Sequence, residues 1–148
     1  MIIISEHAKV SPHADIEDSV RGTRIVIEAG AVIDSFVKIK PAGGSGDVVI
    51  GRNSYINSGT VIYTGNGVTI GEHVLIAANC TLAPVNHQYA SRTQLIASQG
   101  FAPGRGGIII EDDVWIGVGS VILDRIFSRV DLPAPFLPMM PITSPGAA

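Results

Sequence analysis

The chain has 148 residues, a length typical of one folded domain with a sizeable core. Hydrophobic residues make up 46% of it but aromatic residues only 5%, so Ile, Val, Leu and Ala must build the core. The net charge is −3 and the Lys and Arg residues form no basic cluster, which argues against a nucleic-acid partner.

The N-terminal stretch MIIISEHAKV has a short apolar run with no basic segment before it, so it does not resemble a signal peptide. No stretch reaches the roughly 20 consecutive apolar residues that span a bilayer. The single cysteine, Cys80, excludes an internal disulfide framework. These features predict a cytoplasmic protein with no membrane span.

A branched aliphatic residue recurs every six positions through much of the chain. Neither a helix nor a long alternating strand has this period. It predicts short strands joined by tight corners and stacked about 4.8 Å apart, so that each rung hydrogen-bonds to the next. The aliphatic positions are Val10, Ile16, Ile27, Ile33, Ile39, Ile50, Ile56, Ile62, Ile70, Ile76, Leu82, Ile110, Ile116 and Ile122.

A small or β-branched residue follows four positions after most of these aliphatic residues. We expect both positions to face the core, while Gly, Asp, Asn and Glu occupy the corners. The second positions are Ala14, Val20, Ala31, Val37, Ser54, Thr60, Val74, Cys80, Val114 and Ser120.

Four interruptions break the period. Residues 22–24 and 41–47 are expected to be small corner loops, and residues 62–70 shift the phase by two positions. The fourth interruption, residues 88–107, begins directly after His87 and is called the arm here. A loop of that length inside a compact domain usually has a function.

The period ends after Asp124. Five of the nine prolines lie between Pro133 and Pro145, and proline cannot donate a hydrogen bond to a β-ladder. We therefore expect a β-helical domain over residues 1–124 and an irregular Pro-rich tail over residues 125–148.

Hexads such as IEDSVR, IGRNSY, IGEHVL and IEDDVW resemble those of the hexapeptide-repeat superfamily. The combination of NH, a long loop, QG and IIIEDDVWIGVGSVIL resembles its O-acetyltransferase branch, which includes maltose, galactoside, xenobiotic and surface-polysaccharide acetyltransferases. The resemblance implies an all-β, left-handed parallel β-helix with three hexads per turn, although parallel crossovers are normally right-handed. It also implies a homotrimer that uses acetyl-CoA as co-substrate.

The resemblance makes His87 the expected general base for acetyl transfer to a sugar or polysaccharide hydroxyl. A neutral imidazole, whose ordinary pKa is about 6.5, can accept a proton from an alcohol and pass it to the departing thiolate. By the same resemblance, the acceptor is expected to contact Asn57 and Asn86.

The resemblance also assigns Trp115 to the pantetheine arm of coenzyme A, and the backbone amides of Val118 and Gly119 to the same cofactor. Arg105, in the glycine-rich PGRGG, is a further expected contact because its charge suits a coenzyme A phosphate. Asn57 is explained equally well as a corner residue, Trp115 by interface packing, and Arg105 as a solvated loop residue.

Two other functions stay open at this stage. In relatives the segment ILDGV leads into further coils that form much of the coenzyme A site, whereas this chain reads ILDRI and then loses the period. A non-catalytic β-helical scaffold is therefore one alternative. The other is a zinc enzyme resembling the γ-class carbonic anhydrases, but the four histidines, His7, His13, His73 and His87, lack a convincing ligand spacing, so no metal is expected.

Overall fold

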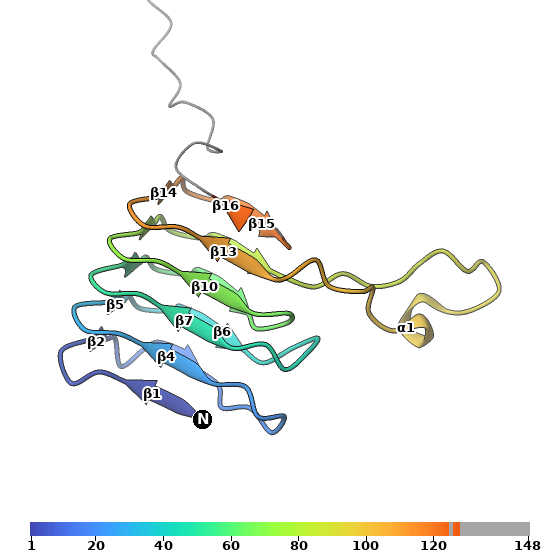
Figure 1. Cartoon of the computed structure of the whole chain (residues 1–148), viewed down its shortest axis with the longest axis horizontal. Helices are drawn as coiled ribbons and strands as arrows, with labels where there is room; N and C mark the ends of the chain where they lie inside the picture. The colour runs from blue at the N-terminus through green and yellow to red at the C-terminus, as the bar shows by residue number, and fades with distance from the viewer. Residues whose placement is uncertain (125, 128–148) are drawn as a thin grey trace, which may run out of the picture.

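The computed structural model describes residues 1–124 and 126–127 of the chain. These residues form a solenoid of short parallel strands stacked in three sheets (Figure 1). Sheet 1 contains β1 (Ile2–Ile4), β4 (Ile25–Ile27), β7 (Val48–Ile50), β10 (Val68–Ile70), β13 (Ile108–Ile110) and β16 (Ile126–Phe127).

The other two sheets have five strands each. Sheet 2 contains β2 (Lys9–Val10), β5 (Val32–Ile33), β8 (Tyr55–Ile56), β11 (Leu75–Ile76) and β14 (Trp115–Ile116). Sheet 3 contains β3 (Asp15–Ile16), β6 (Lys38–Lys40), β9 (Val61–Tyr63), β12 (Thr81–Ala83) and β15 (Val121–Leu123). Successive strands fall in sheets 1, 2 and 3 in turn, which confirms the expected solenoid with three strands per turn.

From the second turn onward the aliphatic positions lie over one another from rung to rung and are almost completely buried, whereas Val10 and Ile16 in the first turn are only partly buried. Each strand pairs with its neighbour so that these residues share one register, and full burial of each contributes about 1.5–3 kcal/mol. The three columns are Ile27, Ile50, Ile70 and Ile110 in sheet 1; Ile33, Ile56, Ile76 and Ile116 in sheet 2; and Ile39, Ile62, Leu82 and Ile122 in sheet 3. The predicted six-residue core is confirmed.

Sheet 1 adds a buried column that the period did not predict. Its members lie two positions before the aliphatic residue, so both ends of these three-residue strands face the core. They are Ile25, Val48, Val68 and Ile108, each at most 1% exposed. Sheet 1 is therefore the most apolar wall of the solenoid.

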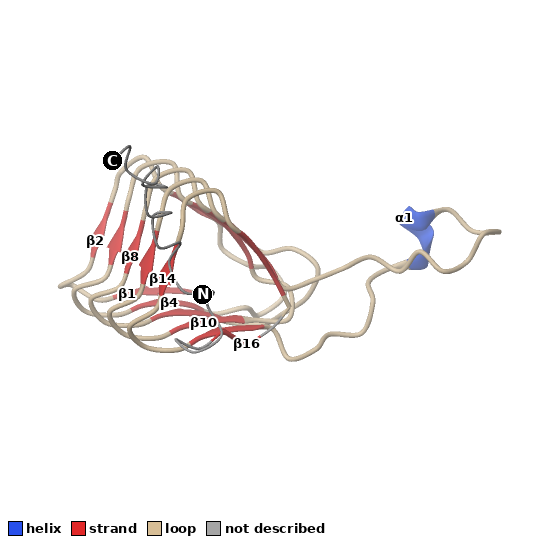
Figure 2. Cartoon of the chain, turned by 90° about the horizontal axis from the view of Figure 1, so that it is seen from above, coloured by secondary structure: helices blue, strands red, loops and turns tan. Residues whose placement is uncertain are grey.

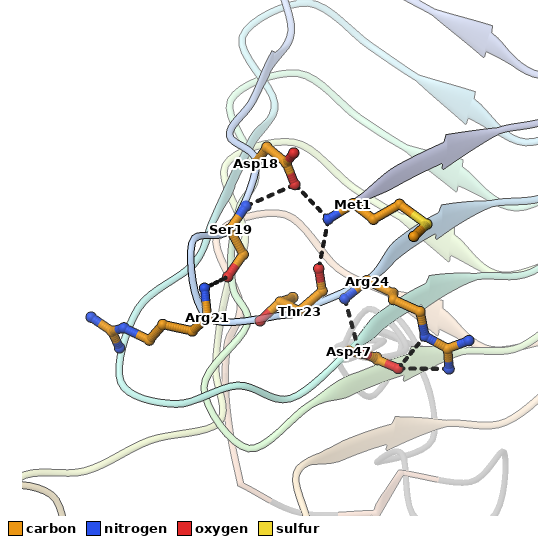
Figure 3. Close-up of polar contacts among 7 residues, drawn as sticks. All are labelled: Met1, Asp18, Ser19, Arg21, Thr23, Arg24 and Asp47. Atoms are coloured by element: carbon orange, nitrogen blue, oxygen red, sulfur yellow. Dashed lines mark hydrogen bonds and ion pairs between the residues drawn. The ribbon is translucent and has the colours of Figure 1, made fainter.

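The prediction that Val20 faces the core is wrong, because its side chain is fully exposed. The segment between β3 and β4 is longer than one hexad, and Thr23 takes the buried position instead. Asp18 holds this loop by accepting hydrogen bonds from the Ser19 amide at 2.8 Å and from the amino group of Met1 at 2.6 Å (Figure 3).

The corner loop of residues 41–47 is tied to the loop below it. Asp47 accepts hydrogen bonds from the Arg24 backbone amide at 2.8 Å and from two guanidinium nitrogens of the same residue, at 2.9 and 2.8 Å (Figure 3). These contacts hold the pKa of Asp47 below its ordinary value, the backbone amide being the largest cause. Adjacent loops on this side thus support one another.

The segment expected to be an irregular tail begins with a strand. β16 pairs in parallel with β13, Ile109 lying opposite Ile126 and Ile110 opposite Phe127, so sheet 1 extends two residues into the 125–148 segment. The expected irregularity of residues 128–148 lies outside the described residues.

The arm carries the short helix α1 (Ile96–Gln99), the only helix among residues 1–124 and 126–127. Nothing in the sequence pattern predicted this helix. Over the same residues, no helix has the length and apolar character needed to cross a bilayer.

Candidate functional site

One corner of the solenoid, between sheets 3 and 1, carries all four interruptions. The strand bounds place residues 17–24, 41–47, 64–67 and 84–107 at this corner in successive turns. Figure 2 shows the arm leaving the solenoid there and projecting away from it. The three shorter loops are therefore stacked at the same corner, on the N-terminal side of the arm.

Antiparallel pairing closes the base of the arm. The Gln88 amide donates to the Gly100 carbonyl at 2.9 Å, and the Ala102 amide donates to the Asn86 carbonyl at 2.7 Å. Between these two hydrogen bonds, His87 and Phe101 form an isolated antiparallel bridge. His87 is thus fixed at the point where the arm joins the solenoid.

The His87 side chain is exposed and packs against one ring. Its centroid lies 4.6 Å from that of Phe101, with the planes tilted by 35°. Such a contact is worth about 0.5–1.5 kcal/mol, enough to favour one ring orientation. No described residue hydrogen-bonds to the imidazole, so its nitrogens are free to meet a ligand.

His87 lines an open cleft of about 780 Å³. The lining combines an imidazole, a phenol, a guanidinium, a carboxylate and two carboxamides with a few apolar side chains, the composition of a site for a polar organic ligand. The lining residues are Asn66, Asn86, His87, Tyr89, Ile96, Ala102, Pro103, Arg105 and Asp124.

Asp124 is the acidic residue of this cleft and is only 8% exposed. Its Oδ2 accepts a short hydrogen bond from the Arg105 backbone amide. Its Oδ1 is buried and has no hydrogen-bond partner among the residues that the structure describes. Asn66 also lines the cleft. Its side-chain amide is fixed because Nδ2 donates a hydrogen bond to the Pro84 carbonyl at 2.8 Å.

The returning half of the arm passes very close to the turn of residues 64–67. A Cβ at Gly107 would lie 2.5 Å from the Gly67 carbonyl oxygen, and the φ of Gly107 is +85°. Only glycine adopts that conformation at low cost and leaves that space. The close approach holds Arg105, two residues away, over the same corner.

The structure brings together only some of the predicted site residues. His87, Asn86 and Arg105 line one cleft. Asn57 lies at the corner between sheets 2 and 3, where its amide donates to the Ile76 carbonyl at 2.7 Å, a contact that fits its alternative explanation as a corner residue.

The remaining predicted residues lie near that other corner. Trp115 projects from the outer face of sheet 2, 60% exposed, and Val118 and Gly119 lie between β14 and β15. None of the three lines the cleft of His87. A single chain therefore separates the predicted coenzyme A residues around Trp115 from the predicted base.

Sequence reasoning missed Asn66, Tyr89, Phe101 and Asp124. Two of them carried a usable signal: Asn66 lies in the turn after β9, and Asp124 directly follows β15, so both occupy the corner that also holds His87. Assigning each predicted strand to one of the three sheets in turn would have placed Asn66 and Asp124 at the same corner as His87. Tyr89 and Phe101 lie on the arm, which has no period to count.

All four histidines lie within the described residues, and no group of three or more His, Cys, Asp or Glu side chains there could hold a metal ion. Cys80 is buried at 1% exposure and its thiol donates to the Gly117 carbonyl at 3.2 Å, as expected for a packing residue.

No protein-family model matches the chain. The galactoside O-acetyltransferase of Escherichia coli (strain K12) is 36% identical over 80 residues, which are 51% of this chain and 36% of that protein. This chain, with its stacked hexads, its three-sheet solenoid and its partial likeness to that enzyme, fits the hexapeptide-repeat acyltransferase superfamily. It spans about a third of the length of that curated superfamily relative.

Solved structures with the same fold include two mutants of AntD, an N-acyltransferase from Bacillus cereus, in complex with dTDP and coenzyme A. The TM-score is 0.64 for both, at 21% and 20% sequence identity. The matches cover 83% and 82% of this chain and 65% and 66% of those chains. At this identity the comparison establishes the fold alone.

Proposed function

We propose that the protein is an acetyl-CoA-dependent O-acetyltransferase that acts on a sugar or polysaccharide hydroxyl, with His87 as general base. The observation that carries the proposal is an exposed, ring-packed imidazole on a polar cleft at the base of the arm. The galactoside O-acetyltransferase named above supports an acetyl donor and a sugar acceptor. Coenzyme A in the AntD structures supports a thioester donor.

In the proposed reaction an imidazole nitrogen of His87 takes the proton of the attacking hydroxyl. The hydroxyl oxygen forms a bond to the thioester carbonyl carbon, and collapse of the tetrahedral intermediate breaks the carbon–sulfur bond. The imidazolium then returns its proton to the departing thiolate, so the enzyme ends unchanged. Such acid–base assistance contributes about 10²–10⁴-fold, and holding both substrates together supplies further acceleration.

We further propose that the site is completed between subunits of a homotrimer. Three of the four expected coenzyme A contacts, Trp115, Val118 and Gly119, lie away from the His87 cleft of their own chain, whereas Arg105 lines it. A cleft facing the sheet 2 side of a second copy would bring both sets together. Exposed apolar side chains support such a contact, with Leu75 and Trp115 adjacent on sheet 2.

The arm supports the same arrangement. Its side chains Tyr89, Leu95 and Ile96 are 78%, 78% and 56% exposed, although they are large and apolar or aromatic. Within one chain Tyr89 and Ile96 line the cleft and Leu95 does not. We propose that the arm reaches a neighbouring copy and encloses the acceptor, and that the acceptor belongs to a surface glycan.

The test follows free thiol release from acetyl-CoA in the presence of a panel of sugars and glycans. The proposal expects release that depends on the acceptor, and a product whose acetyl group is removed by mild base, as an ester is and an amide is not. An amide product would instead indicate N-acetylation. Absence of both release and calorimetric acetyl-CoA binding would favour the non-catalytic scaffold.

Mixed oligomers test the shared site. We expect His87→Ala and Trp115→Ala variants to be inactive alone and to recover activity when co-assembled, because one interface then combines an intact histidine with an intact tryptophan. Activity that never recovers in verified mixed oligomers would place both residues in a site built by one chain.

A further inference from the structure

The buried carboxylate of Asp124 lacks one of the hydrogen bonds that it needs. It is 8% exposed, its Oδ2 accepts a hydrogen bond from the Arg105 amide, and its Oδ1 has no donor within residues 1–124 and 126–127. A buried carboxylate is costly unless its oxygens are hydrogen-bonded. An unmet acceptor on a residue that lines a ligand-sized cleft is available to a donor of a bound molecule.

The surroundings restrict the kind of donor. No salt bridge joins Asp124 to a basic side chain within residues 1–124 and 126–127, although Arg105 lines the same cleft. Among the described residues the cleft lining thus holds one acidic side chain, Asp124, and one guanidinium, Arg105. A neutral ligand preserves that balance, whereas an ammonium or a carboxylate upsets it.

The other polar groups of the cleft suit a polyhydroxylated ring. The side chains of Asn66, Asn86 and Tyr89 offer both donors and acceptors within the same space. A sugar presents several hydroxyls, so one can meet Asp124 while another meets His87. A small monohydric alcohol cannot satisfy both.

We infer that Asp124 is a specificity residue that accepts a hydrogen bond from a second hydroxyl of a neutral sugar, placing the reacting hydroxyl at His87. The inference rests on the proposed function and deepens it by naming the class of acceptor. Asp124 takes no part in the proton transfer. Its contribution is to the binding and orientation of the acceptor.

The Asp124→Asn variant tests this role, because its amide oxygen can still accept the Arg105 N–H while its NH2 group replaces the free oxygen. The ligand-facing group then changes from acceptor to donor. We expect binding of the preferred neutral methyl glycoside, measured by calorimetry or ligand-observed NMR, to weaken about 10- to 100-fold. Asp124→Glu, which keeps the charge, should recover part of the loss.

Asp112→Asn is the matched control, because Asp112 also accepts a backbone hydrogen bond, from Glu72 at 2.7 Å, and does not line the cleft. It should bind the glycoside as the wild-type protein does. Monodeoxy glycosides complete the test: one deoxy position should weaken binding to the wild-type protein and leave binding to Asp124→Asn unchanged.

Equal glycoside binding by the wild type and Asp124→Asn would overturn the inference, and so would no binding of any neutral glycoside to the wild type. Tighter binding of the amino sugar glucosamine than of the neutral sugar glucose would overturn it as well. Should Asp124→Asn fail to fold, the deoxy series on the wild-type protein decides alone, since no sensitive position would contradict the inference. Glycoside binding is measured without turnover, whereas the acetyltransferase proposal is tested by thiol release from acetyl-CoA. Failure of the Asp124 inference can therefore be distinguished from failure of the proposed function.

Discussion

His87 and Phe101 are joined twice, by an antiparallel bridge between their backbones and by ring packing at 4.6 Å between centroids. His87 directly precedes the arm and Phe101 lies in the half of the arm that returns to the solenoid, so the conformation of the arm sets the position of the imidazole. The expected catalytic group therefore depends on a segment that contributes nothing to the buried core.

Phe101→Ala should lower kcat up to about tenfold, because the ring contact it removes is worth about 0.5–1.5 kcal/mol. The KM for acetyl-CoA should change little, since the cleft lining does not include Phe101. Phe101→Tyr keeps the ring and serves as the control in steady-state kinetics. Equal kcat values for the alanine and tyrosine variants would show that ring packing does not position the base.

The close approach of Gly107 to Gly67 should be sensitive to one added methyl group. Gly107→Ala combines a left-handed φ with a backbone contact of 2.5 Å, whereas Gly106→Ala has a φ of +107° and open space around its Cβ. The strain common to both is about 1–3 kcal/mol, and the first variant bears the clash in addition. Urea unfolding and limited proteolysis of the arm should rank Gly107→Ala as the less stable, and the reverse order would contradict the close approach of the two backbones.

The aliphatic column should respond to truncation as a close-packed core. Ile62→Ala, at a residue with 0% exposure, should cost about 2–5 kcal/mol in the free energy of unfolding, and Ile62→Val about 0.5–1.5 kcal/mol. Ile3→Ala makes the same chemical change at a residue with 44% exposure and should cost about 0.5 kcal/mol or less. Chemical denaturation measures all three, and similar costs for Ile62→Ala and Ile3→Ala would contradict an inward-facing column.

One exposed ion pair on sheet 3 gives a pH prediction. Lys38 hydrogen-bonds to Asp15 with Nζ and Oδ2 2.8 Å apart, which lowers the pKa of Asp15 from its ordinary 3.8 and raises the pKa of Lys38 from its ordinary 10.5. The Asp15 contribution to stability is full above pH 3.8 and is lost as the pH falls through the lowered folded pKa. The Lys38 contribution is full below pH 10.5 and is lost as the pH rises through the raised folded pKa.

Asp15→Asn should therefore lower the melting temperature slightly at neutral pH and have a shrinking effect well below pH 3.8. High salt should shrink the effect at neutral pH as well, because the pair is exposed to solvent. Melting curves across pH and salt check both trends. A difference that grows toward acid pH would contradict the assigned pKa direction.

The sequence predicted the register of the solenoid because its physical cause is local. An inward aliphatic such as Ile62 must recur every hexad for the column to close, so its spacing is visible in the residues themselves. Val20 matched the pattern and failed because loop length, not residue type, decides whether a corner position turns inward. The second buried column of sheet 1, which begins with Ile25, was not predicted because the hexad pattern has only one large aliphatic position per strand.

The site was only partly predictable for a different reason. His87 could be found because it marks the boundary between periodic and aperiodic sequence. Asp124 and Asn66 reach the same cleft through stacking at one corner, which joins residues far apart in the chain. Phe101 depends on how the arm folds back, and no pattern in the sequence encodes that return.

Acetyl transfer by His87→Ala, beside His73→Ala, tests the central claim most directly. Both histidines are exposed at corners, but only His87 lines the cleft. We predict that His87→Ala lowers kcat for acetyl transfer about 10²–10⁴-fold while the assembly state stays that of the wild type, and that His73→Ala leaves kcat unchanged. Near-normal turnover by correctly assembled His87→Ala would contradict the account.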